Sequence, residues 1–175
     1  MLPGNARTHQ RDVNGYVWRE CARVLKSSGL LAFTFHQSKI EGWTELVKAL
    51  KVAGFVITSV QPVKAEMSTA APKSGASTPS NLDSVVSCRL ISTTGAPELN
   101  LLASEGLAIH RLGVTKDAGI AVGVADVVSV VRGSILAAWT HPSCQLDLVQ
   151  LAVLAEAAVA RALVVLEVEP KATAC

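Results

Sequence analysis

The feature that most constrains the fold is an alternation of helical and strand patterns within the first 63 residues. Residues 8–26 and 38–53 place apolar side chains three and four positions apart, which predicts two amphipathic helices. The runs LLAFTFH (30–36) and FVITSVQPV (55–63) are rich in aliphatic, β-branched and aromatic residues, which predicts two strands. A helix between two strands of one sheet indicates a right-handed parallel crossover, so the chain is predicted to be an α/β protein.

Local signals mark the ends of these elements. Ser38, with Glu41 three residues later, has the pattern of a capping box for the second helix. Gly29 and Gly54 stand where a left-handed residue would end the two helices. The run at 30–36 shows no polar alternation, so this strand is predicted to be buried on both faces, as in the middle of a parallel sheet.

The chain changes character at 64–82. The segment KAEMSTAAPKSGASTPSNL combines two prolines and a glycine with many Ser, Thr and Ala residues, which predicts a long loop. A loop of this length inside a compact domain is either functional or disordered. DSVVSCRL (83–90) predicts a third strand, and it follows too directly for another crossover, so we expect it to lie antiparallel to the second.

Beyond residue 92 the sequence predicts helices and no strand. The predicted helices are 97–111, 124–139 and 145–167. Residues 113–123 are predicted as loop, and the last two helices as a helical hairpin over 124–167. The chain is therefore divided into a partial α/β region (1–92), which contains the loop 64–82, and a helical region (93–175).

Composition and charge exclude several classes of protein. Half of the residues (50%) are apolar and 17% are charged, which is typical of a globular rather than a disordered chain. The net charge of +2 is too small to produce by itself a strong field toward nucleic acid. The apolar stretch 146–168 carries four charges, which favours an amphipathic helix over a membrane crossing.

The cysteines and the first residues bear on the compartment. The four cysteines, at 21, 88, 144 and 175, are far apart and form no CxxC pair, so we expect no zinc or other metal site. Cys21 and Cys88 fall within apolar helix and strand patterns, which suits reduced thiols in a cytoplasmic protein. MLPGNARTHQRD lacks the apolar core of a secretory signal, which also favours the cytoplasm.

Short motifs stand in a definite order along the first half of the chain. They are Glu20, Arg23-Val24-Leu25-Lys26, Gly29, Phe33-Thr34-Phe35-His36, Trp43, Ala53-Gly54-Phe55 and Cys88-Arg89. Together they resemble the C-terminal catalytic portion of bacterial SAM-dependent DNA methyltransferases of the adenine-specific amino-methylase type. Ser27 and Ser28 replace the Pro and Gly that usually follow RVLK in this family. The RVLK turn is shared by SAM-dependent methyltransferases generally, whereas FTFH, AGF and the closing SCR are more specific.

The resemblance implies a fold and a reaction. The fold is a seven-stranded, mostly parallel Rossmann-like sheet with helices on both faces and a final antiparallel strand pair, of which this chain would supply the C-terminal half. The reaction is transfer of a methyl group from S-adenosylmethionine to a base amine in DNA. DNA is then the expected partner and S-adenosylmethionine the expected cofactor of the intact family enzyme.

Two motifs that this reaction needs are not found in the 175 residues. A glycine-rich turn must let the backbone approach the cofactor closely, and a D-P-P-Y motif must orient the target amine of the flipped base. We therefore expect no catalytic or cofactor-binding residue in this chain, and no S-adenosylmethionine binding by the chain alone. An N-terminal partner half, or a second copy of the chain, is the expected protein partner; no membrane partner is expected.

The resemblance also nominates contact residues. The candidate substrate contacts are His36, Glu66, Ser80 and Asn81. The candidate contacts to DNA phosphates are Lys64, Lys73 and Arg89. His36 ends a strand, on the edge where open α/β sheets bind ligands, but it could equally cap or pack there. The loop could also be a solvated connection, and the glycine-rich segment 119–126 is a weaker candidate for a nucleoside loop.

Three functions remain open at this point. The first is a DNA methyltransferase family member that is inactive alone because its cofactor-binding half is elsewhere. The second is a non-enzymatic interaction module, since a partial sheet leaves an apolar flank that invites pairing with a partner or with itself. The third is a fragment of a methyltransferase that acts on small molecules.

Overall fold

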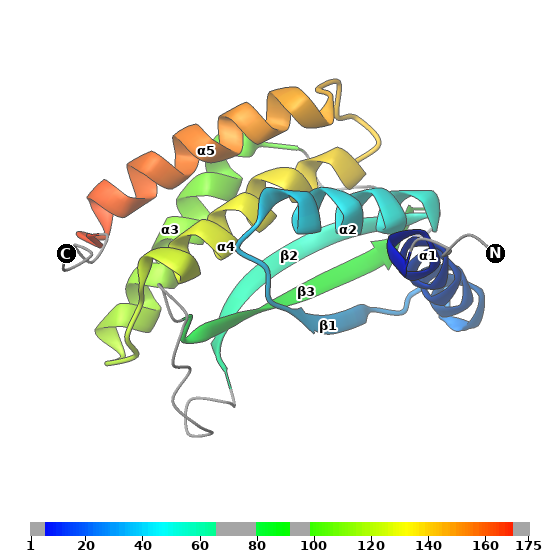
Figure 1. Ribbon diagram of the computed structural model, residues 1–175, viewed down its shortest axis with the longest axis horizontal. Coiled ribbons are helices and arrows are strands. Elements are labelled where there is room, and N and C mark those ends of the chain that lie inside the picture. Colours follow the sequence, from blue (N-terminus) through cyan, green and yellow to red (C-terminus); the bar gives the residue numbers. More distant parts are fainter. Residues whose placement is uncertain (1–5, 66–79, 92–98, 170–175) are drawn as a thin grey trace.

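The computed structural model describes residues 6–65, 80–91 and 99–169, and the structural statements below refer to these residues. Figure 1 shows a small sheet with helices packed above it. The elements in chain order are α1 (Ala6–Val24), β1 (Leu31–Phe35), α2 (Ile40–Val52), β2 (Phe55–Lys64), β3 (Leu82–Leu90), α3 (Leu101–Asp117), α4 (Val124–Leu136), the 3-10 helix η3 (Ala137–Thr140) and α5 (Leu148–Val165). The predicted α/β class is confirmed, as is the helix-strand-helix-strand-strand order of the first half.

The described strands form one sheet in the order β1-β3-β2. β3 lies antiparallel to both neighbours, so β1 and β2 point the same way, as a crossover through α2 requires. The predicted antiparallel arrangement of the second and third strands is confirmed. The sequence pattern did not show that β3 is inserted between the other two, which keeps β1 and β2 from pairing with each other.

The prediction that the first strand is buried on both faces is wrong. β1 pairs along one edge only, through Leu31 opposite Cys88 and Phe33 opposite Val86. Its residues alternate between half-buried and exposed, and none is fully buried. The exposed positions are small or polar, Ala32 and Thr34, so the alternation is present but weak in hydropathy. In the described residues β1 is therefore an edge strand.

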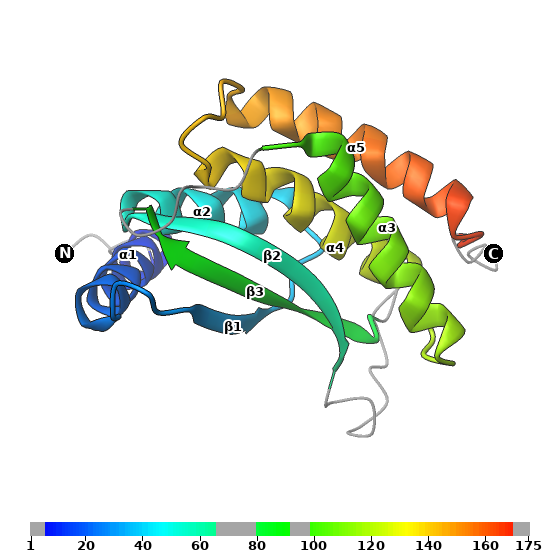
Figure 2. The same cartoon turned by 180° about the vertical axis from the view of Figure 1, so that it is seen from behind.

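The helices cover one face of this sheet. Figures 1 and 2 show α2, α3 and α4 against the sheet, with α5 outside α4. α4 is central, because it touches β2, β3, α2, α3 and α5. Its fully buried apolar side chains include Val127, Val130, Val131 and Leu136. The predicted α/β and helical regions thus share one hydrophobic core, while Ala32, Thr34 and Gln61 on the opposite face are exposed.

Two predicted helix boundaries differ from the structure. The N-cap of α2 is Lys39 rather than Ser38, and no side chain caps it, so the predicted capping box is wrong. The carbonyl of Ser38 instead accepts a hydrogen bond from Arg132. Gly54 has the predicted left-handed backbone, with φ 86°, but Gly29 does not. A Cβ on Gly29 would lie 2.7 Å from Leu25 Cγ, so close contact explains this glycine.

The helix predicted at 97–111 is displaced toward the C-terminus. α3 continues through Gly113 to Asp117, across part of the segment predicted as loop. Leu112 is fully buried, and Lys116 Nζ donates to Leu166 O at 2.7 Å. These contacts tie the last turn of α3 to the end of α5, and tertiary contacts of this kind override local propensity.

Gly133 lies inside α4, where a glycine weakens a helix by about 1 kcal/mol relative to alanine. Its position is explained by Trp43 of α2, whose indole is fully buried. A Cβ on Gly133 would lie 2.4 Å from Trp43 Cη2. Trp43 Nε1 donates to Gln37 O at 2.9 Å, which holds the ring in place. Trp43 is therefore a core residue, and α4 approaches α2 closely because residue 133 has no side chain.

A matched pair of substitutions tests this contact. Gly133→Ala should lower the free energy of unfolding by about 1–3 kcal/mol, because the methyl group must displace the Trp43 ring. Gly106→Ala in α3 meets no atom within 4 Å and should raise it by up to about 1 kcal/mol, because alanine is the better helix former. Urea denaturation of both variants measures the difference, and equal stabilities would refute the close approach.

Candidate functional site

Four residues nominated from the sequence are brought to one end of the sheet. The carboxyl ends of β1 and β2 meet the start of β3 there, because β3 runs opposite to both. His36 directly follows β1, and Lys64 is the last residue of β2, paired with Leu82. Ser80 and Asn81 directly precede β3. We call His36, Lys64, Ser80 and Asn81 the strand-end cluster.

His36 is held at this end by contacts with β3. Its Nδ1 lies 3.1 Å from the carbonyl oxygen of Leu82 and 3.4 Å from Asp83 Oδ1. Both neighbours accept hydrogen bonds, so Nδ1 carries the proton and donates. The side chain is 44% exposed, and Nε2 has no hydrogen-bond partner among the described residues. The ring therefore packs on β3 and also presents one nitrogen for contact.

Asp126 fixes the other half of the cluster. Its carboxylate is fully buried, and Oδ1 accepts from the hydroxyl of Ser80 and from the backbone N–H groups of Asn81 and Leu82, the last two at 2.9 Å. Oδ2 accepts from Gly123 N at 2.8 Å. Four donors satisfy the buried charge. Three of these donors, in Ser80, Asn81 and Leu82, lie 44–46 residues away in sequence, so local sequence patterns do not predict this set of partners.

The Asp126 carboxylate also determines whether the glycine-rich segment 119–126 can bind a nucleoside or phosphate. A nucleoside or phosphate would use the N-terminus of α4, where backbone N–H groups attract an anion. That place is occupied by the side chain of Asp126, which accepts from Gly123 within the same turn. The structure thus provides no open anion site at the N-terminus of α4.

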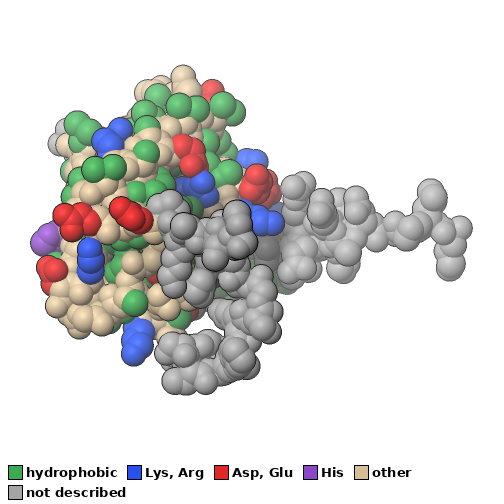
Figure 3. Space-filling view, turned by 60° about the vertical axis from the view of Figure 1, so that its left-hand side comes forward, with side chains coloured by type: hydrophobic (Ala, Val, Ile, Leu, Met, Phe, Trp, Pro, Cys, Tyr) green, Lys and Arg blue, Asp and Glu red, His purple; other side chains and the backbone are tan. Residues whose placement is uncertain are grey.

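The three candidate phosphate contacts are not brought together. Arg89 lies opposite Val56, at the other end of β3 from Lys64, and its Nη1 donates to Ser28 O at 3.0 Å. Glu66 and Lys73 lie outside the described residues. On the face seen in Figure 3, basic and acidic side chains of the described part are interspersed. Any contact between these residues and DNA stays a prediction.

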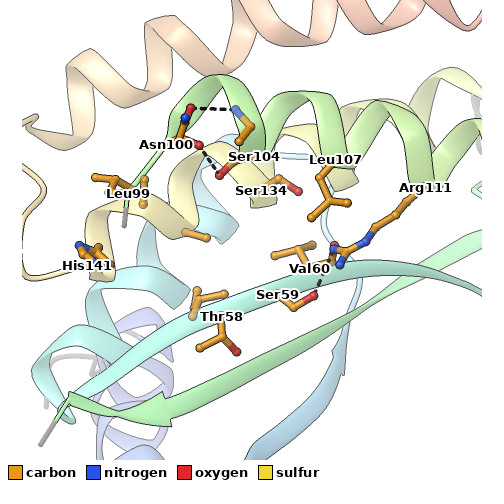
Figure 4. Close-up of a pocket in the computed structure, with 14 residues that line it drawn as sticks. Thr58, Ser59, Val60, Leu99, Asn100, Ser104, Leu107, Arg111, Ser134 and His141 are labelled. Carbon is orange, nitrogen blue, oxygen red and sulfur yellow. Dashed lines mark hydrogen bonds between the residues drawn. The ribbon is translucent and has the colours of Figure 1, made fainter. Parts of the chain in front are cut away.

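A second feature was missed by the sequence analysis. A cavity of about 240 Å³ opens between β2, α3 and η3 (Figure 4). Ile57, Val60, Leu99 and Leu107 contribute apolar walls, and Thr58, Ser104, Arg111 and His141 contribute polar groups. These residues come from segments far apart in the sequence, so no local sequence motif predicts the cavity.

The described residues show neither a metal-ligand cluster nor an activated thiol at Cys88. No group of three or more His, Cys, Asp or Glu side chains among them could hold a metal ion. Burial raises the pKa of the Cys88 thiol to about 12, so this sulfur stays protonated and is a poor nucleophile. Cys88 faces the core beside Ile57 and supports the sheet rather than chemistry.

The Asp126 contacts predict a large effect of a small change. Asp126→Asn replaces one acceptor oxygen by a donor that faces backbone N–H groups, and should lower the free energy of unfolding by about 2 kcal/mol or more. Asp147→Asn is the matched control: Asp147 is the exposed N-cap of α5, accepts from Gln150 N at 2.8 Å, and asparagine caps equally well. Equal free energies of unfolding of the two variants in urea would show that the hydrogen bonds to Asp126 do not stabilise the fold.

Comparison with protein-family models, with curated proteins and with solved structures finds no match to this chain. The functional proposals below therefore rest on its own residues and contacts.

Proposed function

We propose that this chain supplies the closing part of the sheet of a SAM-dependent DNA methyltransferase, and that a strand of a cofactor-binding half pairs with the free edge of β1. The motifs between Glu20 and Arg89 suggest the family. The final antiparallel pair β2–β3 and the crossover through α2 are compatible with its sheet. The observation that carries the proposal is the difference between the two edges of the described sheet.

β2, at one edge, has features that oppose the addition of another strand. Pro62 lacks a backbone N–H, Lys64 brings a charge, and the register shifts between Ile57 and Ser59, which is a bulge at Thr58. Natural proteins use prolines, lysines and bulges to keep exposed edges from pairing. β2 is thus suited to remain an edge.

β1, at the other edge, has none of these features. Its sequence LAFTF contains no proline and no charge, and its pairing with β3 is regular through all five residues. The backbone groups that point away from β3 have no strand partner among the described residues. Phe33 and Phe35 are only half-buried, although their opposite residues Val86 and Ser84 are fully buried. An added strand would satisfy this edge and cover both rings.

The position of His36 fits this arrangement. A strand added parallel to β1 would bring its own carboxyl end to the end of the sheet where His36 lies. Ligands of open α/β sheets bind outside the carboxyl ends of the strands. The added half would therefore place cofactor and flipped base beside the strand-end cluster, with His36 nearest to the junction. His36 would contact substrate there, while Ser80 and Asn81 would act through their fixed backbone.

A second candidate function, an assembly module without catalysis, is favoured by the outer face of α5. Val149, Val153 and Val164 are 74%, 66% and 78% exposed. The two charged residues of α5 are already paired, Glu156 with Arg132 and Arg161 with Glu105. By length and composition alone this helix could even cross a membrane, with 28% of it buried. Its packing on α4 supports a contact surface for protein instead.

Calorimetric titration with S-adenosylmethionine tests the proposed division of labour. The isolated chain should release no heat of binding at concentrations up to about 1 mM, because it has no glycine-rich turn against which the cofactor could lie. It should also transfer no methyl group to DNA. Binding with a micromolar Kd would show that the cofactor site lies within these residues and would end the proposal.

Light scattering after size-exclusion chromatography separates the two candidates. With the cofactor-binding half absent, the chain should self-associate through β1, and Ala32→Lys/Thr34→Lys should return it to monomer by adding charge along that edge. Gln61→Lys, on the same face but on β2, is the control and should not change the mass.

Val153→Lys tests α5 in the same way. A dimer abolished by Val153→Lys alone would favour the assembly module, and a wild-type monomer would count against both surfaces.

A further inference from the structure

The cavity between β2, α3 and η3 is lined by polar as well as apolar side chains. His141 is 7% exposed, and its ring is one wall of the cavity. Its Nδ1 accepts from the backbone N–H of Ser143 at 3.2 Å and lies 2.7 Å from the Ser143 hydroxyl. Because Nδ1 accepts a hydrogen bond from Ser143 N, Nε2 carries the ring proton. Nε2 has no acceptor among the described residues, but the atom is itself fully buried, so it is not exposed to the cavity.

Arg111 brings an uncompensated positive charge to the same cavity. Its Nη1 donates to Ser59 Oγ at 3.1 Å and to Val60 O at 2.8 Å, which fixes the guanidinium against β2. No carboxylate pairs with Arg111 in the described part of the chain, and no acidic residue is among those that line the cavity. Burial lowers the pKa of this guanidinium, which reflects the unfavourable loss of water around its charge. An anion would relieve that desolvation.

The N-terminus of α3 adds to the positive potential. Asn100 caps this 17-residue helix through Ala103 N at 2.9 Å, and the first turn contains no acidic residue. Ala103 and Ser104 from this turn line the cavity. Figure 4 shows Asn100 and Ser104 on one wall, with His141 and Arg111 toward two ends. A helix N-terminus favours a negative group, and here it lines the same cavity as Arg111, whose charge lacks an acidic partner among the described residues.

We propose that this cavity binds a small monocarboxylate with a short apolar body. Arg111 supplies the counter-charge, and its N–H groups beyond those of Nη1 donate to the carboxylate. Ile57, Leu99 and Leu107 form the walls against which an aliphatic chain would pack. A volume of about 240 Å³ is below that of pockets for drug-sized molecules, so the ligand has only a few carbon atoms. This site is separate from the strand-end cluster and does not depend on the methyltransferase proposal.

An NMR titration of the 15N-labelled full chain tests the site, with hexanoate as the probe and hexanol as its uncharged match. Hexanoate should change the chemical shifts of the backbone amide signals of Ser104 and Ala138 until binding saturates, with a Kd of about 1 mM or below. Hexanol should bind at least about tenfold more weakly. Equal affinity for the two would overturn the carboxylate assignment, and the absence of any shift up to about 20 mM hexanoate would overturn the site.

Two substitutions test whether Arg111 contributes to hexanoate binding. Arg111→Gln removes the charge but keeps a donor toward Val60 O, and should weaken hexanoate at least about tenfold. Arg89→Gln is the matched control at the far end of β3 and should bind like the original chain. Unchanged binding by a folded Arg111→Gln would refute the proposal. The comparison of hexanoate with hexanol needs no variant, so the test stands even if Arg111→Gln fails to fold.

Discussion

The structure depends on a buried carboxylate that joins its two layers. Asp126 at the start of α4 accepts hydrogen bonds from Ser80, Asn81 and Leu82, where the central strand β3 begins. β3 pairs with both outer strands, and α4 contacts β2, β3 and the helices α2, α3 and α5. A single side chain thus ties the middle of the sheet to the middle of the helical layer. It also sets the place of the strand-end cluster, because the same bonds anchor Ser80 and Asn81.

The free edge of β1 connects this architecture with function. One edge of the sheet is protected by a proline, a lysine and a bulge on β2, whereas β1 is regular, apolar and uncharged. Half-buried Phe33 and Phe35 lie along the unprotected edge, next to the end where His36 presents a ring nitrogen. These features together suit a sheet completed by another segment. The cavity that is proposed to bind a monocarboxylate lies beside β2, at the opposite edge of the sheet from β1, where α3 and η3 pack on β2.

Local patterns predicted what depends on local physics. The antiparallel strands at 55–63 and 83–90 and the left-handed terminator Gly54 were predicted from local sequence patterns. Local patterns missed or misplaced the features that distant residues determine. Asp126 takes its partners from a segment about 45 residues away, and Lys116 holds α3 helical by reaching the end of α5. The cavity was invisible because Arg111 and His141 meet only when α3 and η3 pack on β2.

Amide hydrogen exchange along β1 tests the central claim most directly. In an antiparallel edge strand, alternate N–H groups point away from the partner strand. In the Ala32→Lys/Thr34→Lys monomer, the β1 amides directed toward β3 should be protected, and the alternate ones between them should exchange nearly as fast as in an unfolded peptide. Uniform protection of all β1 amides in this monomer would mean that the edge is covered within the chain itself, and would contradict the account.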